Sequence, residues 1–330
     1  MRILSTGLVM DTPQAAKDFG ESITKIGPFD LVLCNARLNQ ERHDAAGSAE
    51  IPSSKIYIKI ADALPSIRGI RALGYSFDEN HIRILSSHGE PVACVSDGQE
   101  ITVTPQGVRN SAVLTGAFNA ALLQRGYVLL HGSGAMWGDK ATIWFGDSGA
   151  GKSTAASIAV ARGAVLLSDD IVPLRIVNGC LVTFQREREL ALDPHPIDEL
   201  VWVYQKLLKI EGELASVDEC KDREREDGKL LFRTALMRGE YEVSTINHLS
   251  QKSGSEVDGP LRQASLFSWL GRAFVGLEFT RSRFPCNHVE IFQRLLNAAR
   301  NCEREHFDPN SKSDKRAVKP VQICAKKPWV

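Results

Sequence analysis

The sequence has no excess of charge of either sign, because 40 Lys and Arg residues balance 40 Asp and Glu residues. A protein with this balance has no overall electric field that would attract nucleic acid or an anionic membrane surface. We therefore expect no nucleic acid and no membrane among its partners. Any partner has to be recognised by a local site.

Long hydrophobic runs and clustered cysteines are also missing. No stretch approaches the roughly 18 apolar residues that a membrane-spanning helix needs. The apolar run at the N-terminus meets Asp11 too soon for a signal peptide. The seven cysteines form no CxxC pair, and no Cys/His cluster has the spacing of a zinc site. We expect a soluble, cytoplasmic protein with reduced thiols.

The N-terminal third of the chain reads as short strands separated by Gly, Asp, Asn and Ser. Its β-rich runs are 29–34, 55–60, 81–85, 91–95 and 100–104. We expect a smaller β-rich N-terminal lobe over residues 1–105. The polar, lysine-containing segment 309–330 at the other end is interpreted as a flexible tail.

The pattern changes to an α/β alternation in the middle of the chain. Apolar residues recur at helical spacing from Ser111 and stop at Gly126. The apolar runs 127–130 and 141–145 read as buried strands, and the glycine-containing stretch 132–140 reads as a turn region between them. A helix is predicted over 152–162, followed by a strand over 164–167. We assign residues 106–308 to one α/β catalytic domain.

The segment between the second apolar run and the helix matches the phosphate-binding pattern GxxxxGK[ST]. Its glycines let the backbone curve around a phosphate, while the start of the helix adds its positive dipole end. Lys152 is predicted to reach the β- and γ-phosphates of ATP, and the Ser153 hydroxyl to ligate Mg²⁺. The predicted nucleotide-binding residues are Gly146, Asp147, Ser148, Gly149, Ala150, Gly151, Lys152, Ser153 and Thr154.

Two acidic residues, Asp169 and Asp170, follow the next predicted strand. If that strand returns beside the loop-bearing strand, its end lies next to the phosphates. One carboxylate can then hold Mg²⁺ while the other accepts a proton from an incoming hydroxyl. The alternative is an exposed turn after a strand. His131, at the end of the preceding strand, either orients the catalytic Asp, contacts a phosphate or has a structural role.

These residues together resemble the catalytic domain of HPr kinase/phosphorylase and its relatives, including the kinases of lasso-peptide biosynthesis. The resemblance runs from about Tyr127 to Leu174 and includes the His-Gly pair, the GDSGAGKS loop and the Ser-Asp-Asp strand end. It implies a P-loop core related to that of phosphoenolpyruvate carboxykinase, transfer of phosphate to a serine hydroxyl, and a homo-oligomer as an option. It also implies roles for four residues: Asp170 as proton acceptor, Lys152 on the phosphates, Ser153 on Mg²⁺ and His131 in the active site. Asp169 is the predicted second metal ligand.

The family's second acidic metal ligand, in a Glu-Ile-Arg-Gly setting, has no matching motif in this sequence. The nearest segment is 185–189, which we interpret as a solvated charge run. The alternative is that Arg186 and Arg188 stabilise charge on the transferring phosphoryl group. The family segment associated with dephosphorylation is not recognisable, so phosphorylase activity is not expected.

The leading hypothesis is an ATP- and Mg²⁺-dependent serine kinase acting on a peptide or small protein. One alternative is a nucleotide-binding regulatory or sensory protein with little or no kinase activity. Another is a kinase of a small hydroxylated metabolite. A transport ATPase is disfavoured, because no LSGGQ-like signature is present and the acidic pair comes too early in the chain.

Overall fold

The computed structural model describes residues 2–4, 7–9, 22–34, 54–64, 70–72, 74–78, 81–146, 148–193, 198–214, 229–249, 274–275 and 290–295. The chain divides into two compact units, Met1–Tyr127 with Gly276–Cys286 and Val128–Val275 with Asn287–Val330. The predicted domain boundary at 105 and 106 falls earlier than this division. The domain assignment stays a prediction, and the expected tail at 309–330 lies outside the described residues.

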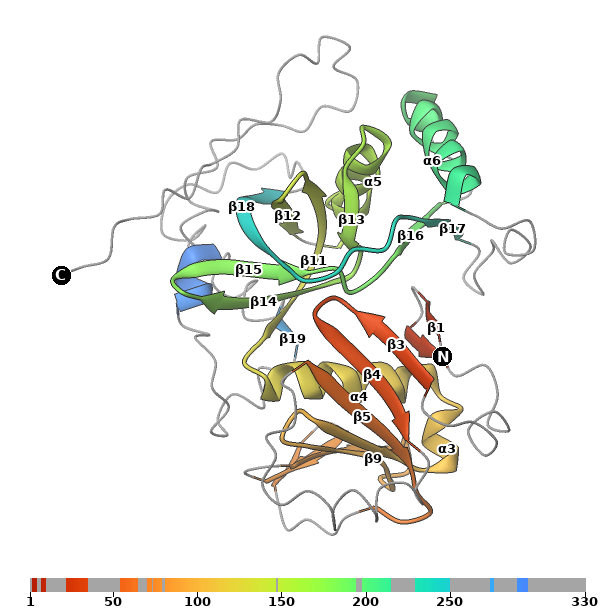
Figure 1. Cartoon of the computed structure of the whole chain (residues 1–330), viewed down its shortest axis with the longest axis vertical. Helices are drawn as coiled ribbons and strands as arrows, with labels where there is room; N and C mark the ends of the chain where they lie inside the picture. Colours follow the sequence, from red (N-terminus) through yellow and green to blue (C-terminus); the bar gives the residue numbers. More distant parts are fainter. Residues whose placement is uncertain are drawn as a thin grey trace, which may run out of the picture. The chain divides into compact units, whose positions relative to one another are not determined.

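The first unit is built on a mixed sheet of eight strands (Figure 1). In sheet order they are β3 (Ser22–Ile26), β4 (Phe29–Cys34), β5 (Lys55–Ile60), β10 (Glu100–Val103), β9 (Pro91–Ser96), β8 (His81–Leu85), β7 (Tyr75–Phe77) and β6 (Ile70–Ala72). A separate antiparallel pair consists of β1 (Arg2–Leu4) and β2 (Gly7–Val9). The predicted β-rich runs are confirmed by β4, β5, β8, β9 and β10.

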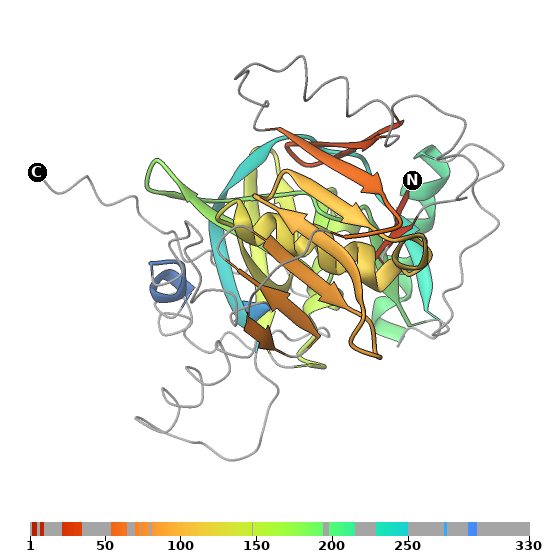
Figure 2. The same ribbon diagram turned by 90° about the horizontal axis from the view of Figure 1, so that it is seen from below.

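Along β5 and β8 of the eight-stranded sheet, buried side chains alternate with half-buried ones, so each of these strands has one apolar face. Ile56 and Ile58 of β5 are fully buried. The helices α3 (Pro105–Val108) and α4 (Ser111–Gln124) pack on this unit, and Figures 1 and 2 show α4 lying along the sheet. The Asn110 side chain caps α4 by accepting hydrogen bonds from two backbone N–H groups of its first turn. The predicted helix start at Ser111 is confirmed.

The second unit contains a sheet of seven strands, and the pairings of five of these strands close into a ring. In sequence the strands of this sheet are β11 (Val128–Trp137), β12 (Lys140–Gly146), β13 (Val165–Ser168), β14 (Ile171–Val177), β15 (Cys180–Phe184), β18 (Glu240–Leu249) and β19 (Phe274–Val275). The ring runs from β11 to β12, β18, β15 and β14 and back to β11. The strands β13 and β19 pair only with β11 and lie outside the ring.

The helix α5 (Lys152–Ala161) packs against β11 and β12 of the ring. The helix α6 (Val201–Leu214), which follows the 3-10 turn η1 (Asp198–Leu200), packs against α5. The strands β16 (Glu189–Leu192) and β17 (Leu230–Arg233) form an antiparallel pair beside them. Trp144 of β12, Ala156 of α5 and Leu207 of α6 share one buried apolar cluster. None of the helices in the described part of the chain is long and apolar enough to cross a membrane.

The strand β11 is longer than the sequence predicted, so the expected turn region 132–140 is wrong over most of its length. Residues 132–137 continue the strand, and the hairpin turn is confined to Gly138 and Asp139. Gly132 and Gly134 lie within the strand and not in a turn. Gly132 is instead required by close packing, because a Cβ atom there would lie 2.8 Å from the Trp144 carbonyl oxygen.

Candidate active site

The strand β11 brings the loop and the acidic pair together, because it separates β12 from β13 and is antiparallel to both. The strands β12 and β13 are therefore parallel to each other, and their carboxyl ends reach the same part of β11. The end of β12 pairs with β11 where Phe145 faces Gly132, and the end of β13 pairs where Ser168 faces Gly134. The strand β11 lies between β12 and β13, so these two parallel strands are not direct neighbours.

The acidic pair does not form an ordinary strand end. The strands β13 and β14 pair with the same edge of β11 and run in the same direction. Asp169 and Asp170 lie between these two strands in the chain and interrupt the pairing. The Gly132 N–H donates to the Asp170 carbonyl at 2.9 Å, and the Ser168 hydroxyl donates to the Ile171 carbonyl at 2.6 Å. These two bonds hold the interruption in place, so both carboxylates project next to residues 131–133.

The backbone of the glycine loop is held closely against the neighbouring strand. Gly146 ends β12 and pairs with Leu249 of the parallel strand β18. A Cβ atom on Gly146 would lie 2.0 Å from the Leu249 carbonyl oxygen, so only glycine fits there. Gly149 and Gly151 have φ angles of 76° and 92°, in the left-handed region that favours glycine. Asp147 lies outside the described residues.

The predicted nucleotide-binding residues meet at the start of α5. Ser148, Gly149 and Ala150 form the turn, Gly151 is the N-cap, and Lys152, Ser153 and Thr154 form the first turn of the helix. The buried Lys152 side chain donates from Nζ to the Gly146 carbonyl at 3.0 Å. The start of a helix combines unbonded backbone N–H groups with the positive dipole end, which suits an anion.

Asp169 is held by groups from three different elements. The Ser133 hydroxyl lies 3.0 Å from the Asp169 carbonyl oxygen and 3.4 Å from its Oδ1 atom. The Ala191 N–H donates to Oδ2 at 3.1 Å. Burial raises the pKa of the Asp169 carboxyl, and the hydrogen bond from the Ser153 side chain acts in the opposite direction. Ser153 and Asp169, the two predicted metal ligands, therefore contact each other.

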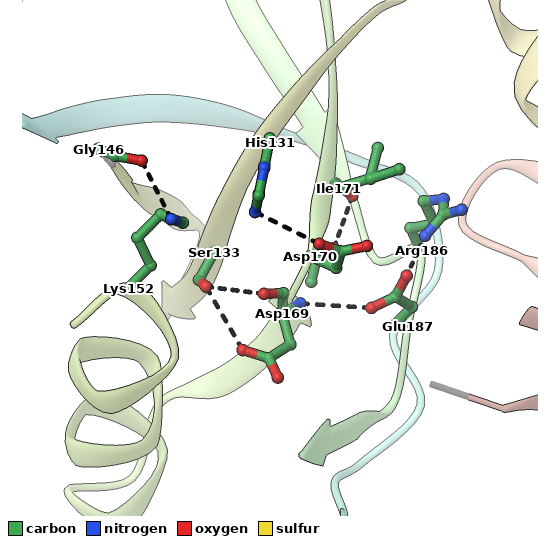
Figure 3. A network of polar contacts seen from close by, with 10 residues as sticks. His131, Ser133, Gly146, Lys152, Asp169, Asp170, Ile171, Arg186 and Glu187 are labelled. Carbon is green, nitrogen blue, oxygen red and sulfur yellow. Dashed lines mark hydrogen bonds and ion pairs between the residues drawn. The ribbon is translucent and has the colours of Figure 1, made fainter. Parts of the chain in front are cut away.

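Asp170 lies in a more open environment than Asp169. Its Oδ1 atom is 3.5 Å from His131 Nε2, and the two side chains are 65% and 48% exposed. Figure 3 shows the two carboxylates pointing in different directions, Asp170 toward His131 and Asp169 toward Ser133. One predicted acid is thus open to an incoming molecule, while the other faces the loop-bearing helix.

The interpretation of 185–189 as a solvated charge run is wrong, because every residue in it except Arg188 is buried. The Gln185 side chain bonds to three backbone groups, the carbonyls of Leu166 and Ala235 and the N–H of Met237. These bonds fix the start of the run in the interior of the unit. The run connects two strands without a glycine or proline, and the absence of these turn residues is the sequence signal that argues against an exposed loop there.

Glu187 is a site residue that the sequence did not identify. Its Oε2 atom accepts a hydrogen bond from the Asp169 N–H at 3.4 Å, and its other oxygen is paired with Arg186. The pKa of Glu187 is raised to about 7, mainly by burial and also by the charges of Asp170 and Asp169, while the Arg186 guanidinium acts in the opposite direction. The buried carboxyl groups of Asp169 and Glu187 therefore lie in one region where negative charge is unfavourable.

The donor set at Ser153 and Asp169 suits Mg²⁺. Both offer hard oxygen atoms, and Mg²⁺ in phosphate sites commonly takes one or two protein ligands and completes its shell with water and phosphate oxygens. Within the described ranges, no group of three or more His, Cys, Asp or Glu side chains is arranged to enclose a metal by itself. A metal here would depend on the nucleotide for part of its shell.

No family model matches the sequence, and no curated protein matches it. Among solved structures, the chain is similar to the Hpr(Ser) kinase/phosphatase from Coxiella burnetii, with 18% sequence identity and a TM-score of 0.24. The match covers 40% of this chain and 71% of that one. With so low a TM-score the likeness carries no argument about function, which depends instead on the geometry of the site.

Proposed function

We propose that the chain is an ATP- and Mg²⁺-dependent phosphotransferase with an HPr kinase-like P-loop core, and that it phosphorylates a serine hydroxyl of a peptide or small protein. One observation carries the proposal. The Ser153 side chain, in the first turn of α5, contacts Asp169, while the adjacent Asp170 is open to solvent. The two residues that would face the phosphates, Ser153 and Asp169, are thus next to Asp170, the residue that would face the acceptor hydroxyl. Phosphoryl transfer requires this arrangement.

The loop 146–153 would hold the β- and γ-phosphates of ATP. The nucleotide replaces the Gly146 carbonyl as the partner of the Lys152 ammonium group, because phosphate oxygens offer a stronger, charged acceptor. The backbone N–H groups at the start of α5 bind the same phosphates. This accounts for a buried lysine placed at the first position of a helix.

Ser153 and Asp169 would hold Mg²⁺, which neutralises negative charge on the β- and γ-phosphates. The electrostatics of the site support a cation there. Burial raises the pKa of both Asp169 and Glu187, and the nearby carboxylates add to each shift. A bound cation relieves this repulsion and favours the ionised form of Asp169.

Asp170 is the proposed base. Its carboxylate takes the proton of the serine hydroxyl as that oxygen forms a bond to the γ-phosphorus, the bond from the γ-phosphorus to the bridging oxygen breaks, and ADP leaves. His131 lies within 3.5 Å of Asp170 and orients it. Because both side chains are about half exposed or more, a hydroxyl on a protein surface has a path to the base.

The test is transfer of labelled γ-phosphate from ATP in a cell extract from the source organism. Label on a protein or peptide band supports the proposal, whereas label on a small molecule favours the metabolite kinase. Asp170→Asn should keep ATP binding and lose transfer, while Lys152→Ala should weaken both. Asp139→Asn, the same change at an exposed hairpin turn, is the matched control and should transfer normally.

Two results would contradict the proposal. ATP binding without label on any acceptor favours the regulatory or sensory alternative. Full transfer by Asp170→Asn would show that another group accepts the proton, or that none is needed in the loose transition state of phosphoryl transfer.

A further inference from the structure

Ser133 is a fully buried serine in the middle of β11, at 0% exposure. Its hydroxyl carries one proton and lies within reach of two acceptors on the same residue, the carbonyl oxygen of Asp169 at 3.0 Å and Oδ1 of Asp169 at 3.4 Å. It thus contacts the main chain and the side chain of one carboxylate residue (Figure 3).

The contacts of Ser133 complete the immobilisation of Asp169. The Asp169 N–H donates to Glu187, and Oδ2 accepts from the Ala191 N–H. With Ser133 on the carbonyl and on Oδ1, the backbone N–H, the carbonyl and both carboxylate oxygens of Asp169 have protein partners. A carboxylate can accept about four hydrogen bonds or metal bonds, so the bonds from Ser133, Ala191 and Ser153 leave one acceptor site for a metal.

A serine that only fills a buried position needs a single acceptor, and Ser157 of α5 is an example. Ser157 is 2% exposed, and its hydroxyl donates to the Thr154 carbonyl at 2.7 Å. Ser133 differs because its second acceptor is the carboxylate that also contacts Ser153 of the phosphate loop. The second contact of Ser133 therefore affects the arrangement of the proposed metal site rather than the packing of the core.

We propose that Ser133 is a positioning residue, which fixes the Asp169 carboxylate toward Ser153 so that these two can bind Mg²⁺ together with the nucleotide. The inference rests on the proposed function, since it concerns the same metal. Hydrogen-bond partners of metal ligands orient the ligand, and removing them typically weakens metal binding by about 10- to 100-fold.

The experiment measures ADP binding to the full chain with and without Mg²⁺, by calorimetric titration. We expect Ser133→Ala to reduce the Mg²⁺-dependent gain in ADP affinity by about tenfold, while metal-free ADP affinity stays within about twofold. Ser133→Thr, which restores the hydroxyl, should recover most of the gain. Ser157→Ala, the matched buried control, should keep the wild-type gain. Mn²⁺ binding in the presence of ADP, followed by electron paramagnetic resonance, should give the same order of variants.

A Ser133→Ala protein that unfolds cooperatively and keeps the full Mg²⁺-dependent gain would overturn the proposal. An equal loss in Ser157→Ala would also overturn it, because any buried serine would then have the same effect. If Ser133→Ala does not fold, Ser133→Cys replaces it, and a wild-type gain with that weak donor is again contradictory. Wild-type protein that binds ADP no better with Mg²⁺ than without would instead refute the proposed function itself.

Discussion

His131 Nε2 lies 3.5 Å from Asp170 Oδ1 in a pair whose side chains are both open to solvent. The adjacent Asp169 has the opposite surroundings, with hydrogen bonds from buried groups on β11 and β16. Two neighbouring carboxylates in one chain segment thus have different environments, and different environments allow different chemical roles.

The His131 and Asp170 contact predicts that His131→Gln lowers kcat for phosphoryl transfer, because the base is no longer held in place. We expect a loss of about 10- to 100-fold with the KM for ATP within about twofold, since misplacing a reacting group affects turnover more than ground-state binding. Steady-state kinetics with the labelled acceptor measure both values. His81→Gln is the matched control, because His81 forms a similar pair with Asp78 in the other unit, at 3.0 Å. A similar loss in the control would contradict a specific role of His131.

Ser153 is predicted to contribute only to the metal-dependent part of nucleotide binding. Ser153→Ala removes the hydroxyl that contacts Asp169, so the rise in melting temperature that ADP causes should become nearly independent of Mg²⁺. In the wild type, ligand at 100 times its Kd should stabilise the protein by about 2.7 kcal/mol. Thermal unfolding with ADP, with and without Mg²⁺, tests this. An unchanged response to Mg²⁺ in the variant would exclude Ser153 as a ligand.

Gly146 is predicted to tolerate no side chain, because a Cβ atom would overlap the Leu249 carbonyl at 2.0 Å. Gly146→Ala should lower the free energy of unfolding by about 2 kcal/mol or more and displace the loop from its phosphate-binding shape. Urea unfolding and ADP titration report the two effects. Gly116→Ala in α4 is the control, since its Cβ atom meets Ile84 at an ordinary 3.4 Å and alanine favours a helix. Equal losses in the two variants would argue against the close approach as the cause.

Glu187 is predicted to make the metal-free protein less stable as pH rises. Its carboxyl group has a pKa of about 7 in the folded protein against a model value of 4.5, so the folded state binds a proton that the unfolded chain releases. The favourable contribution is therefore complete below about pH 4.5 and is lost as pH rises through about 7. Glu187→Gln should flatten this part of the profile, as measured by urea unfolding from pH 5 to 8 without Mg²⁺. If the free energy of unfolding falls equally with pH in the wild type and in Glu187→Gln, a group other than Glu187 binds the proton.

Local patterns in the sequence were sufficient for some elements and not for others. The strands β5 and β8 were predictable because apolar side chains alternate along them and turn residues bound them. The loop after β12 was predictable because its glycines and Lys152 form one contiguous pattern, GxxxxGK[ST]. In both cases the determining residues are adjacent in the chain.

The parts that were missed depend on contacts between distant residues. The extension of β11 requires Gly132 to lie against Trp144, and a strand containing glycines reads locally as a turn. Burial of Glu187 depends on Gln185 binding the backbone of Leu166 and Ala235. Closure of the ring depends on β12 pairing with β18, which comes about a hundred residues later in the chain.

The strand β11 sets the distance between the two parts of the site. One of its edges pairs with β12, which leads into the glycine loop, and the other edge pairs with β13 and β14, which flank the two acids. Side chains alternate along a strand, so His131 and Ser133 share a face and each reaches one of the two acids. A slip of one residue in the pairing of β14 and β11 would change which β11 residues lie opposite the two acids. The spacing between the phosphate loop and the carboxylates is thus set by register, and a single insertion in β11 should abolish it even if every site residue is retained.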